Sequence, residues 1–462
     1  MRKLFLLPCL LLLSISLSAQ TLTTTDTLVN QAFELAVWTI DHNTHNQILE
    51  AGAGYGGEWT RDCAMNSWNA ASLLRPEVAE HSLWSVTNDS LTIGHQYWDK
   101  IVWTIAAYNH YLVTGNEAFL DKTYPCAKNT MTELEMQCFD SVSGLFMGPA
   151  VFQDGIAGYD EPVYDPQKWD DSFVLHHPNS TTIKCLSTNL IYFQSYRALA
   201  EMAMLIEPTM AAEFEIKASE LKDNIRATFY RPEEHKFYYL IDHLGHPHDY
   251  QEGLGLAFAM LFDVVSNDEA TEIVQNTFVT EHGLPCVYPS FPRNTPDKPG
   301  RHNMMVWPHV NMYFASGCAH QKQYDAFYFE LFNLTDLAMN RGKGDFYEIY
   351  TIDGEPSGGY QCGALWDKKE HQTWCATGFI RLFLNHIFGL TFTVNGMELH
   401  PIGMEDGTVC SLEEINYRGA TLSITVSGHG ETIKSCKING VEAEPFIPAD
   451  AKGDFRVEID LE

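Results

Sequence analysis

The spacing of apolar residues changes once along this chain, near residue 388, and that change constrains the fold more than any other feature. Between about residues 28 and 388, apolar and aromatic residues recur every three or four positions, as in 98–112. Such spacing is typical of amphipathic helices. Beyond 388 they occupy alternate positions, as in 422–426, which is typical of half-buried strands. The sequence therefore predicts a large helical domain followed by a small β domain.

The helical part holds roughly eleven or twelve candidate helices, separated by long loops rich in Gly, Pro, Trp, Tyr and Asp. Helices that are this aromatic on one face must bury that face against one another. A helix–loop–helix rhythm along the chain then favours a closed toroid of helical hairpins. Long structured loops on such a scaffold are where functional sites commonly lie.

The last segment, residues 389–462, is expected to form a small antiparallel β-sandwich. Its apolar residues alternate in several short runs, and Asn439-Gly440 is a strong signal for a hairpin turn. A structural role, as an accessory domain that covers the helical part, is favoured over carbohydrate binding because a fold alone does not specify a function.

The N-terminus has the pattern of a secretory signal peptide. Met1-Arg2-Lys3 is a short basic region, the run from Leu4 to Leu13 is apolar, and small residues lead to Ala19. The apolar run is too short to cross a bilayer, and no later stretch is long enough. We therefore expect cleavage near Ala19, leaving 20–388 as the helical domain of a periplasmic or secreted protein without membrane insertion.

The chain is strongly acidic, which excludes several classes of partner. It carries 60 Asp and Glu against 29 Lys and Arg among 462 residues, a formal net charge of −31. A surface of this sign repels the phosphates of nucleic acids and of anionic membranes. The net charge does not identify a partner, because an acidic surface exposed to solvent accounts for it completely.

The first of three loop clusters with candidate chemistry is Glu58-Trp59-Thr60-Arg61-Asp62. Adjacent arginine and aspartate can hydrogen-bond vicinal hydroxyl groups, while the indole of Trp59 stacks on the apolar face of a sugar. The alternative is that Asp62 caps a helix over 63–75 and pairs with Arg61. The local sequence leaves both interpretations open.

The second cluster spans 148–161 and carries two carboxylates, Asp154 and Asp160, among glycines and aromatic residues. A carboxyl group in a poorly solvated aromatic loop has a raised pKa, which a general acid near neutral pH requires. The alternative is an ordinary Asp-Gly turn at Asp154-Gly155.

The third cluster places a glutamate between two tyrosines. Glu348 lies between Tyr347 and Tyr350, ahead of a Gly/Pro-rich loop, and a segment with Gln372 and Trp374 follows. A carboxylate flanked in this way can activate water against a sugar carbon. The alternative is a strand in which Glu348 faces solvent.

The order of these elements resembles a known family. Trp59-x-Arg61-Asp62 at a helix start, Met305–Asn311, and Phe346–Tyr350 followed by the loop Gly354–Gly359 look like motifs of inverting α-glycosidases with (α/α)6 toroids. That six-hairpin group comprises debranching enzymes, processing glucosidases of glycoside hydrolase family 63, and mannosylglycerate-hydrolase-like relatives. The motifs are short, and the resemblance spans about residues 30–388.

The resemblance implies an (α/α)6 catalytic domain that cleaves α-glycosidic bonds of oligosaccharides with inversion. Glu348 corresponds to the catalytic base of the family. The general acid of the family lies in a Ser-Gly-x-Asp type of motif, which Gly158-Tyr159-Asp160 could match. Asp154 is an equally good match and is favoured, because the glycine after it lets the loop turn tightly into a cleft.

The implied mechanism is a single displacement by two carboxyl groups roughly 6.5–9.5 Å apart, with room for a water molecule between them. Arg61 and Asp62 would hold the sugar. The tryptophans Trp59, Trp307 and Trp374 would form walls, with Tyr347, Tyr350 and Gln372 as further contacts. Hydrolysis of this kind requires no cofactor, and no metal site is expected.

Two rival functions fit a similar toroid. Polysaccharide lyases and uronyl hydrolases act on anionic sugars and should line the cleft with basic residues, whereas the clusters here are mostly acidic and aromatic. A secreted glycan-binding protein on a glycosidase scaffold should keep the aromatic walls and lose one carboxylate, whereas both kinds of residue are present.

A group of histidines between His235 and His248 raises the question of a metal ion. Histidines this close in a loop can converge on one ion. They lack any fixed helical spacing, so a polar surface turn is the favoured interpretation.

Overall fold

The computed structural model describes the chain from Gln20 to Glu462 except for a few segments. The residues not described are Gly56, Glu58, 153–177, Arg293, 296–298 and 362–363. The expected signal peptide, residues 1–19, and the two candidate acids Asp154 and Asp160 therefore lie outside the described residues.

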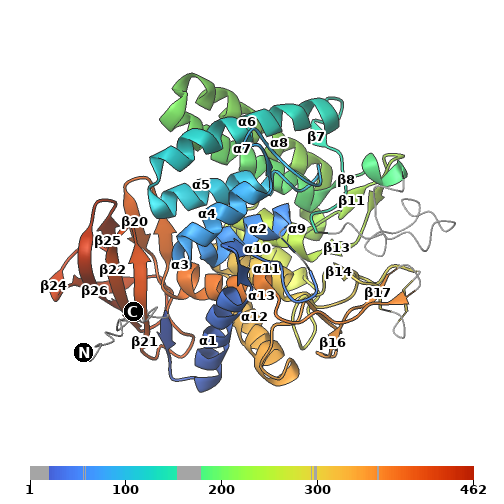
Figure 1. The fold of residues 1–462 in the computed structure, drawn as a ribbon. Helices are drawn as coiled ribbons and strands as arrows, with labels where there is room; N and C mark the ends of the chain where they lie inside the picture. Colours follow the sequence, from blue (N-terminus) through green and yellow to red (C-terminus); the bar gives the residue numbers. More distant parts are fainter. Residues whose placement is uncertain are drawn as a thin grey trace, which may run out of the picture.

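Within the described part of the chain, six outer helices alternate with six inner helices (Figure 1). The outer helices are α1 (Thr27–His42), α4 (Pro76–Ser85), α6 (Glu117–Cys138), α8 (Pro208–Phe229), α10 (Asn267–Asn276) and α12 (Tyr324–Asp336). The inner helices are α2 (Thr60–Asn66), α5 (Val102–Thr114), α7 (Leu186–Ile206), α9 (Gly253–Leu261), α11 (Pro308–His320) and α13 (Thr373–Leu382). Helix α2 continues through a π-helical turn, Ser67–Ala71, into α3 (Ser72–Leu74).

The inner helices form a closed ring. Each packs against the next in chain order, from α2 through α5, α7, α9 and α11 to α13, and α13 packs back against α2. Helix α13 is buried at all of its ten positions, which requires neighbours on every side. A closed inner ring surrounded by outer helices confirms the predicted fold class, an (α/α)6 toroid.

Local sequence signals define where several of these helices begin. Asp26 caps α1 by accepting hydrogen bonds from the backbone N–H groups of Leu28 and Val29. Ser266 and Glu269 form a reciprocal capping box at α10, as the sequence predicts. Helices α4, α8 and α11 have proline in the first turn, where a missing N–H costs nothing.

The helical part ends at Ile387, and the C-terminal residues form two sheets that Figure 1 shows beside the toroid. The smaller sheet contains β19 (Leu390–Phe392), β20 (Gly396–Leu399) and β25 (Phe446–Pro448). The larger has the order β1 (Thr21–Thr23), β21 (Cys410–Tyr417), β22 (Gly419–Ser427), β26 (Lys452–Leu461), β23 (Ile433–Ile438) and β24 (Val441–Glu442).

The larger sheet joins the two ends of the described chain. Strand β1 pairs antiparallel with β21, although Thr21 and its partner Glu413 lie almost 400 residues apart. The other neighbours in this sheet are also antiparallel except β22 and β26, which run parallel. The C-terminal region is thus antiparallel as predicted, with one parallel pair.

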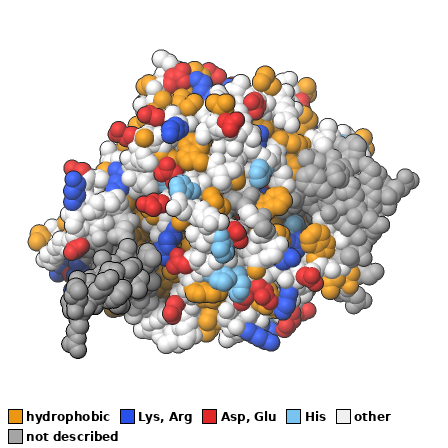
Figure 2. All heavy atoms as spheres, in the orientation of Figure 1, with side chains coloured by type: hydrophobic (Ala, Val, Ile, Leu, Met, Phe, Trp, Pro, Cys, Tyr) orange, Lys and Arg blue, Asp and Glu red, His pale blue; other side chains and the backbone are white. Residues whose placement is uncertain are grey.

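The loops that lead into the inner helices gather on one side of the toroid. Short hairpins in these loops, such as β13 (Gln251–Glu252) with β14 (Val287–Tyr288), lie on the side away from the C-terminal sheets (Figure 1). On the face seen in Figure 2, acidic side chains are spread among Lys and Arg instead of forming one patch. None of the described helices is both long enough and apolar enough to span a membrane.

Candidate active site

Glu348 is the centre of a buried hydrogen-bonded triad. Glu348 is 4% exposed, so the interpretation that it faces solvent from a strand is wrong. Arg301 Nη2 donates to Glu348 Oε1 at 2.6 Å, and the Tyr55 hydroxyl donates to Oε2 at 2.8 Å. The Arg301 Nη2 atom also reaches the Tyr55 oxygen at 3.0 Å. Each carboxylate oxygen thus keeps a second lone pair for a water molecule.

The Gly/Pro-rich loop after Glu348 holds the arginine of this triad in place. Arg301 Nη1 donates to the Gly358 carbonyl at 2.8 Å. Gly359 has φ +68°, and a Cβ atom there would lie 2.8 Å from Arg301 Cα, so only glycine lets the loop pass this close. The triad is therefore built from three separate loops.

The electrostatics of the triad keep a proton on Tyr55. Burial, and then the negative charge of Glu348, raise the pKa of the Tyr55 hydroxyl far above its usual range. Tyr55 consequently stays a hydrogen-bond donor at any working pH. The Arg301 guanidinium, 5% exposed in its side chain, balances the carboxylate charge in this buried position.

Arg61 and Asp62 form the second charged group of the site. Helix α2 begins at Thr60, after Trp59, so Asp62 lies in the first turn and is not the cap of a helix that starts at 63. Arg61 Nε lies 3.7 Å from Asp62 Oδ2, and its Nη1 lies 3.4 Å from Asp99 Oδ2. Gln96 accepts a further bond from Nη1 at 3.1 Å.

A wall of buried aromatic rings connects the two charged groups. Trp307, at the start of α11, is stacked by His302 at 4.3 Å and by His309 at 4.6 Å between ring centroids. Trp374, at the start of α13, packs edge-on against Trp307 and His309. Phe152 contacts His309 at 4.4 Å. We call these five residues the aromatic wall.

The aromatic wall lies between Arg61 and the glutamate triad. The Arg61 guanidinium carbon is 5.9 Å from the centre of the Phe152 ring, at one end of the wall. His302, at the other end, directly follows Arg301 in the chain. The predicted residues Arg61, Asp62, Trp307, Glu348 and Trp374 are therefore brought together around one site.

Polar atoms of the wall are buried without partners. Both ring nitrogens of His302 and of His309, and the indole N–H groups of Trp307 and Trp374, have no hydrogen-bond partner among the described residues. Burial, with a smaller effect of nearby arginine, lowers the pKa of His309 to about 3 and that of His302 well below its usual value. Both imidazoles are therefore neutral at physiological pH.

The remaining predicted binding residues have other surroundings. Tyr350 is 1% exposed, and its hydroxyl donates to the Leu337 carbonyl at 3.0 Å, so this group is engaged inside the protein. The Tyr347 hydroxyl donates to Glu370 at 3.2 Å. Gln372 is fully buried, with its Oε1 unpaired among the described residues. Trp59 is 41% exposed, and its ring lies edge-on to that of His95.

Sequence reasoning missed Tyr55, Asp99, Arg301, His302 and His309 as members of this site. Tyr55 and Arg301 lie in irregular loops, and no local motif marks them. His309 occurs inside the predicted Met305–Asn311 element, so its position next to Trp307 was an available signal. Asp99 precedes α5 by three residues, and a search for polar residues at the start of each inner helix would have found it.

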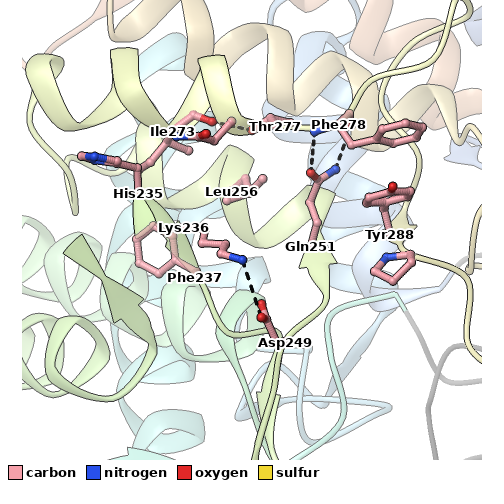
Figure 3. Close-up of a pocket in the computed structure, with 12 residues that line it drawn as sticks. His235, Lys236, Phe237, Asp249, Gln251, Leu256, Ile273, Thr277, Phe278 and Tyr288 are labelled. Atoms are coloured by element: carbon pink, nitrogen blue, oxygen red, sulfur yellow. Dashed lines mark hydrogen bonds and ion pairs between the residues drawn. The ribbon is translucent and has the colours of Figure 1, made fainter. Parts of the chain in front are cut away.

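A separate cavity of about 310 Å³ lies behind the β13–β14 hairpin (Figure 3). Several of its polar groups are already paired: Lys236 Nζ lies 3.6 Å from Asp249, and the Gln251 amide binds the backbone of Phe278 in both directions. Asp249 is the one carboxylate among the described residues that line this cavity, so these residues do not supply the two carboxyl groups that the predicted hydrolysis requires.

Two groups of residues bear on metal binding. The histidines of 235–248 do not converge; His246 and His248 instead flank the buried carboxylate of Asp242. Among the described residues, Asp345, Glu370 and His371 are the one set of three whose ligand atoms lie within 4.8 Å of each other. Within that set, Asp345 already accepts hydrogen bonds from the His371 backbone and ring at 3.0 and 2.9 Å.

The fold and this site together define a six-hairpin glycosidase. A closed (α/α)6 ring carries a buried glutamate, a paired arginine and aspartate, and aromatic walls at one end. Residues 76–375 match the family model described as the mannosylglycerate hydrolase MGH1-like glycoside hydrolase domain. The chain belongs to this family of glycoside hydrolases.

Solved structures share the fold at low sequence identity. The glycoside hydrolase family 63 mannosylglycerate hydrolase from Thermus thermophilus, in complex with Tris, is 15% identical with a TM-score of 0.59, over 76% of this chain and 99% of that one. The family 78 rhamnosidase of Bacillus sp. GL1 is 15% identical with a TM-score of 0.59, over 96% of this chain and 44% of that one. Comparison with curated protein sequences finds no significant match.

Proposed function

We propose that this protein is an exported glycosidase that cleaves α-glycosidic bonds of oligosaccharides by a single, inverting displacement. The observation that carries the proposal is the triad around Glu348. A buried carboxylate held on both oxygens by Tyr55 and Arg301 is fixed in position and charged, as a general base must be before it takes a proton.

Glu348 acts in this mechanism on a water molecule, not on the sugar itself. The water donates one hydrogen to the carboxylate, and its oxygen attacks the anomeric carbon from the face opposite to the leaving group. Arg301 stabilises the charged base, while Tyr55 fixes the orientation of the carboxylate. The proton that Glu348 gains is released to solvent after the sugar leaves.

The general acid is assigned to Asp154, with Asp160 as the second candidate. Support comes from the sequence: Asp154 follows Phe152 of the aromatic wall by two residues. Such an acid protonates the glycosidic oxygen as the bond to the anomeric carbon breaks. Arg61 and Asp62 bind hydroxyl groups of the same sugar.

The α linkage and the inversion rest on the family. The likeness to a mannosylglycerate hydrolase and a rhamnosidase shows a shared fold, and we infer from membership in the MGH1-like family that the reaction type is shared too. Export rests on the signal-peptide pattern of residues 1–19.

The test is sugar release from a panel of α-linked gluco-, manno-, galacto- and rhamno-disaccharides, with the first-formed product anomer followed by NMR. The wild type should release one sugar as the β anomer. Glu348→Gln and Asp154→Asn should both abolish release, and activity that survives only in Asp154→Asn would move the acid to Asp160. Release of the α anomer would contradict inversion, and sugar binding without any release would favour the glycan-binding alternative.

A further inference from the structure

The two histidines of the aromatic wall are an unusual pair. His302 and His309 are 5% and 0% exposed, and they stack on the same indole ring of Trp307. All four of their ring nitrogens lack a hydrogen-bond partner among the described residues. A neutral imidazole has one N–H donor and one acceptor nitrogen, so each ring leaves one of each unsatisfied.

A buried polar group without a partner destabilises the folded state, and folded proteins rarely tolerate it away from a functional site. Stacking on Trp307 requires a flat ring, which phenylalanine would supply without that penalty. The wall nevertheless has imidazoles at both places, next to two indole N–H groups that are also unpaired among the described residues. Donors and acceptors left unpaired in one cluster are what a ligand with several hydroxyl groups could satisfy.

The charges near the wall restrict the ligand further. The cationic groups that act on the two imidazoles are Arg61 and Arg301. Arg301 is paired with Glu348, and Arg61 with Asp62 and Asp99. A carboxylate on the sugar would meet two guanidinium groups whose charge is already matched, and three carboxylates that repel it.

We propose that His302 and His309 are substrate-binding residues that recognise the hydroxyl groups of an uncharged sugar ring and select against its uronic acid. Each imidazole gives one hydrogen bond as donor and one as acceptor, and the Trp307 and Trp374 indoles donate two more. This inference rests on the proposed function, since it names the class of sugar bound at the same site.

The selection against uronic acids is tested with pairs of sugars that differ only at C6. Binding of D-glucose and D-glucuronate, and of D-galactose and D-galacturonate, is measured by calorimetry on the wild-type protein at pH 7. At least one neutral sugar should bind at least tenfold more tightly than its uronate. Equal or tighter binding of the uronate would overturn the proposal.

The role of the histidines is tested with His302→Phe and His309→Phe, which keep a flat ring and remove the nitrogens. Each variant should bind the neutral sugar about tenfold more weakly, the loss expected for a neutral hydrogen bond or two. The Tm of each variant without sugar should equal or exceed that of the wild type, because an unsatisfied polar group has been removed.

His110→Phe is the matched control. His110 is also fully buried and packs on an aromatic ring, Phe119, but its Nδ1 is hydrogen-bonded to Ser72 at 3.0 Å and its Nε2 lies 3.9 Å from a carboxylate oxygen of Glu80. This variant should lose Tm and keep sugar affinity. If His302→Phe and His309→Phe behave like it, with lower Tm and unchanged affinity, the two histidines are structural and the proposal is wrong.

Hydrolysis of the disaccharide panel by the same variants separates the two proposals. If the wild type hydrolyses a neutral substrate and both histidine variants have the same kcat/KM as the wild type, the histidine inference alone is refuted. A wild type that neither binds nor hydrolyses any of the sugars would refute the proposed function and the inference together.

Discussion

Arg301 Nη2 lies 2.6 Å from Glu348 Oε1, and each of these side chains is 5% exposed. The two residues come from loops 47 positions apart in the sequence, and they meet at the end of the toroid where the inner helices begin. An ion pair this deeply buried is stable only while both partners are present, because removal of either leaves an uncompensated charge.

Replacement of Glu348 by glutamine should abolish catalysis and also lower stability. Glutamine keeps the shape of the side chain and can accept the hydrogen bond from Arg301, but it cannot take a proton and it leaves the buried guanidinium without its counter-charge. We expect kcat to fall by about 10²–10⁴-fold, the usual contribution of a general base. Steady-state kinetics and thermal unfolding measured on one preparation check this, and a variant with more than a tenth of wild-type kcat would exclude Glu348 as the base.

Removal of Arg301 should be far more damaging than its replacement by lysine. Arg301→Ala leaves the buried Glu348 carboxylate without its cation, which costs about 3–5 kcal/mol of stability. Arg301→Lys keeps the charge and loses the second hydrogen bond to Gly358. Chemical denaturation of both variants tests the expected order, and equal stability of the two would show that charge is not what this pair supplies.

Glu252, just before α9, should make stability depend on pH. Its Oε2 accepts the Ser187 backbone N–H at 3.1 Å, and burial raises its pKa to about 8 from 4.5. Between these values the unfolded chain is ionised and the folded protein keeps the proton. The contribution of Glu252 to stability should therefore be greatest below pH 4.5 and fall by about 1.4 kcal/mol per pH unit up to pH 8, with no further loss from this group above that.

Glu252→Gln removes this titration and keeps the hydrogen bond from Ser187. The variant should match the wild type near pH 5 and exceed its Tm increasingly toward pH 8. Glu330→Gln is a parallel case, because burial raises the pKa of Glu330 to about 7, so its advantage should level off about one pH unit earlier. Tm curves that stay parallel from pH 5 to pH 9 would contradict both assignments.

Tyr350→Phe should reduce stability more than it reduces activity. The Tyr350 hydroxyl accepts the Tyr347 backbone N–H and donates to the Leu337 carbonyl, and its loss leaves both buried groups unpaired. A loss of about 1–3 kcal/mol is expected. A KM that rises by tenfold with little change in Tm would instead restore Tyr350 as a substrate contact.

The fold was largely predictable because its signals are local. Helical spacing, the Ser266–Glu269 capping box and the change of spacing near residue 388 each depend on neighbours in sequence, and each agrees with the structure. The parallel pairing of β22 with β26 was not predictable in this way. It depends on which strands meet across the sheet, and strand spacing carries no direction.

Residues of the site were predictable from the sequence only where they belong to a short recognisable motif. Glu348 and Trp307 stand in recognisable elements, whereas Tyr55 and Arg301 reach the site through the tertiary path of irregular loops. Tyr350, expected as a further substrate contact from the family resemblance, has its hydroxyl bonded to the Leu337 carbonyl within the protein. The roles of Asp154 and Asp160 stay predictions.

The pairing of β1 with β21 has a consequence for how the chain reaches its native state. Residues 21–23 are synthesised long before 410–417, which they pair with. Strand β21 in turn pairs with β22, and β22 with β26. The sheet can thus be completed only after β26 has been synthesised, and a ribosome that stalls before that strand leaves β1 without a finished sheet to join.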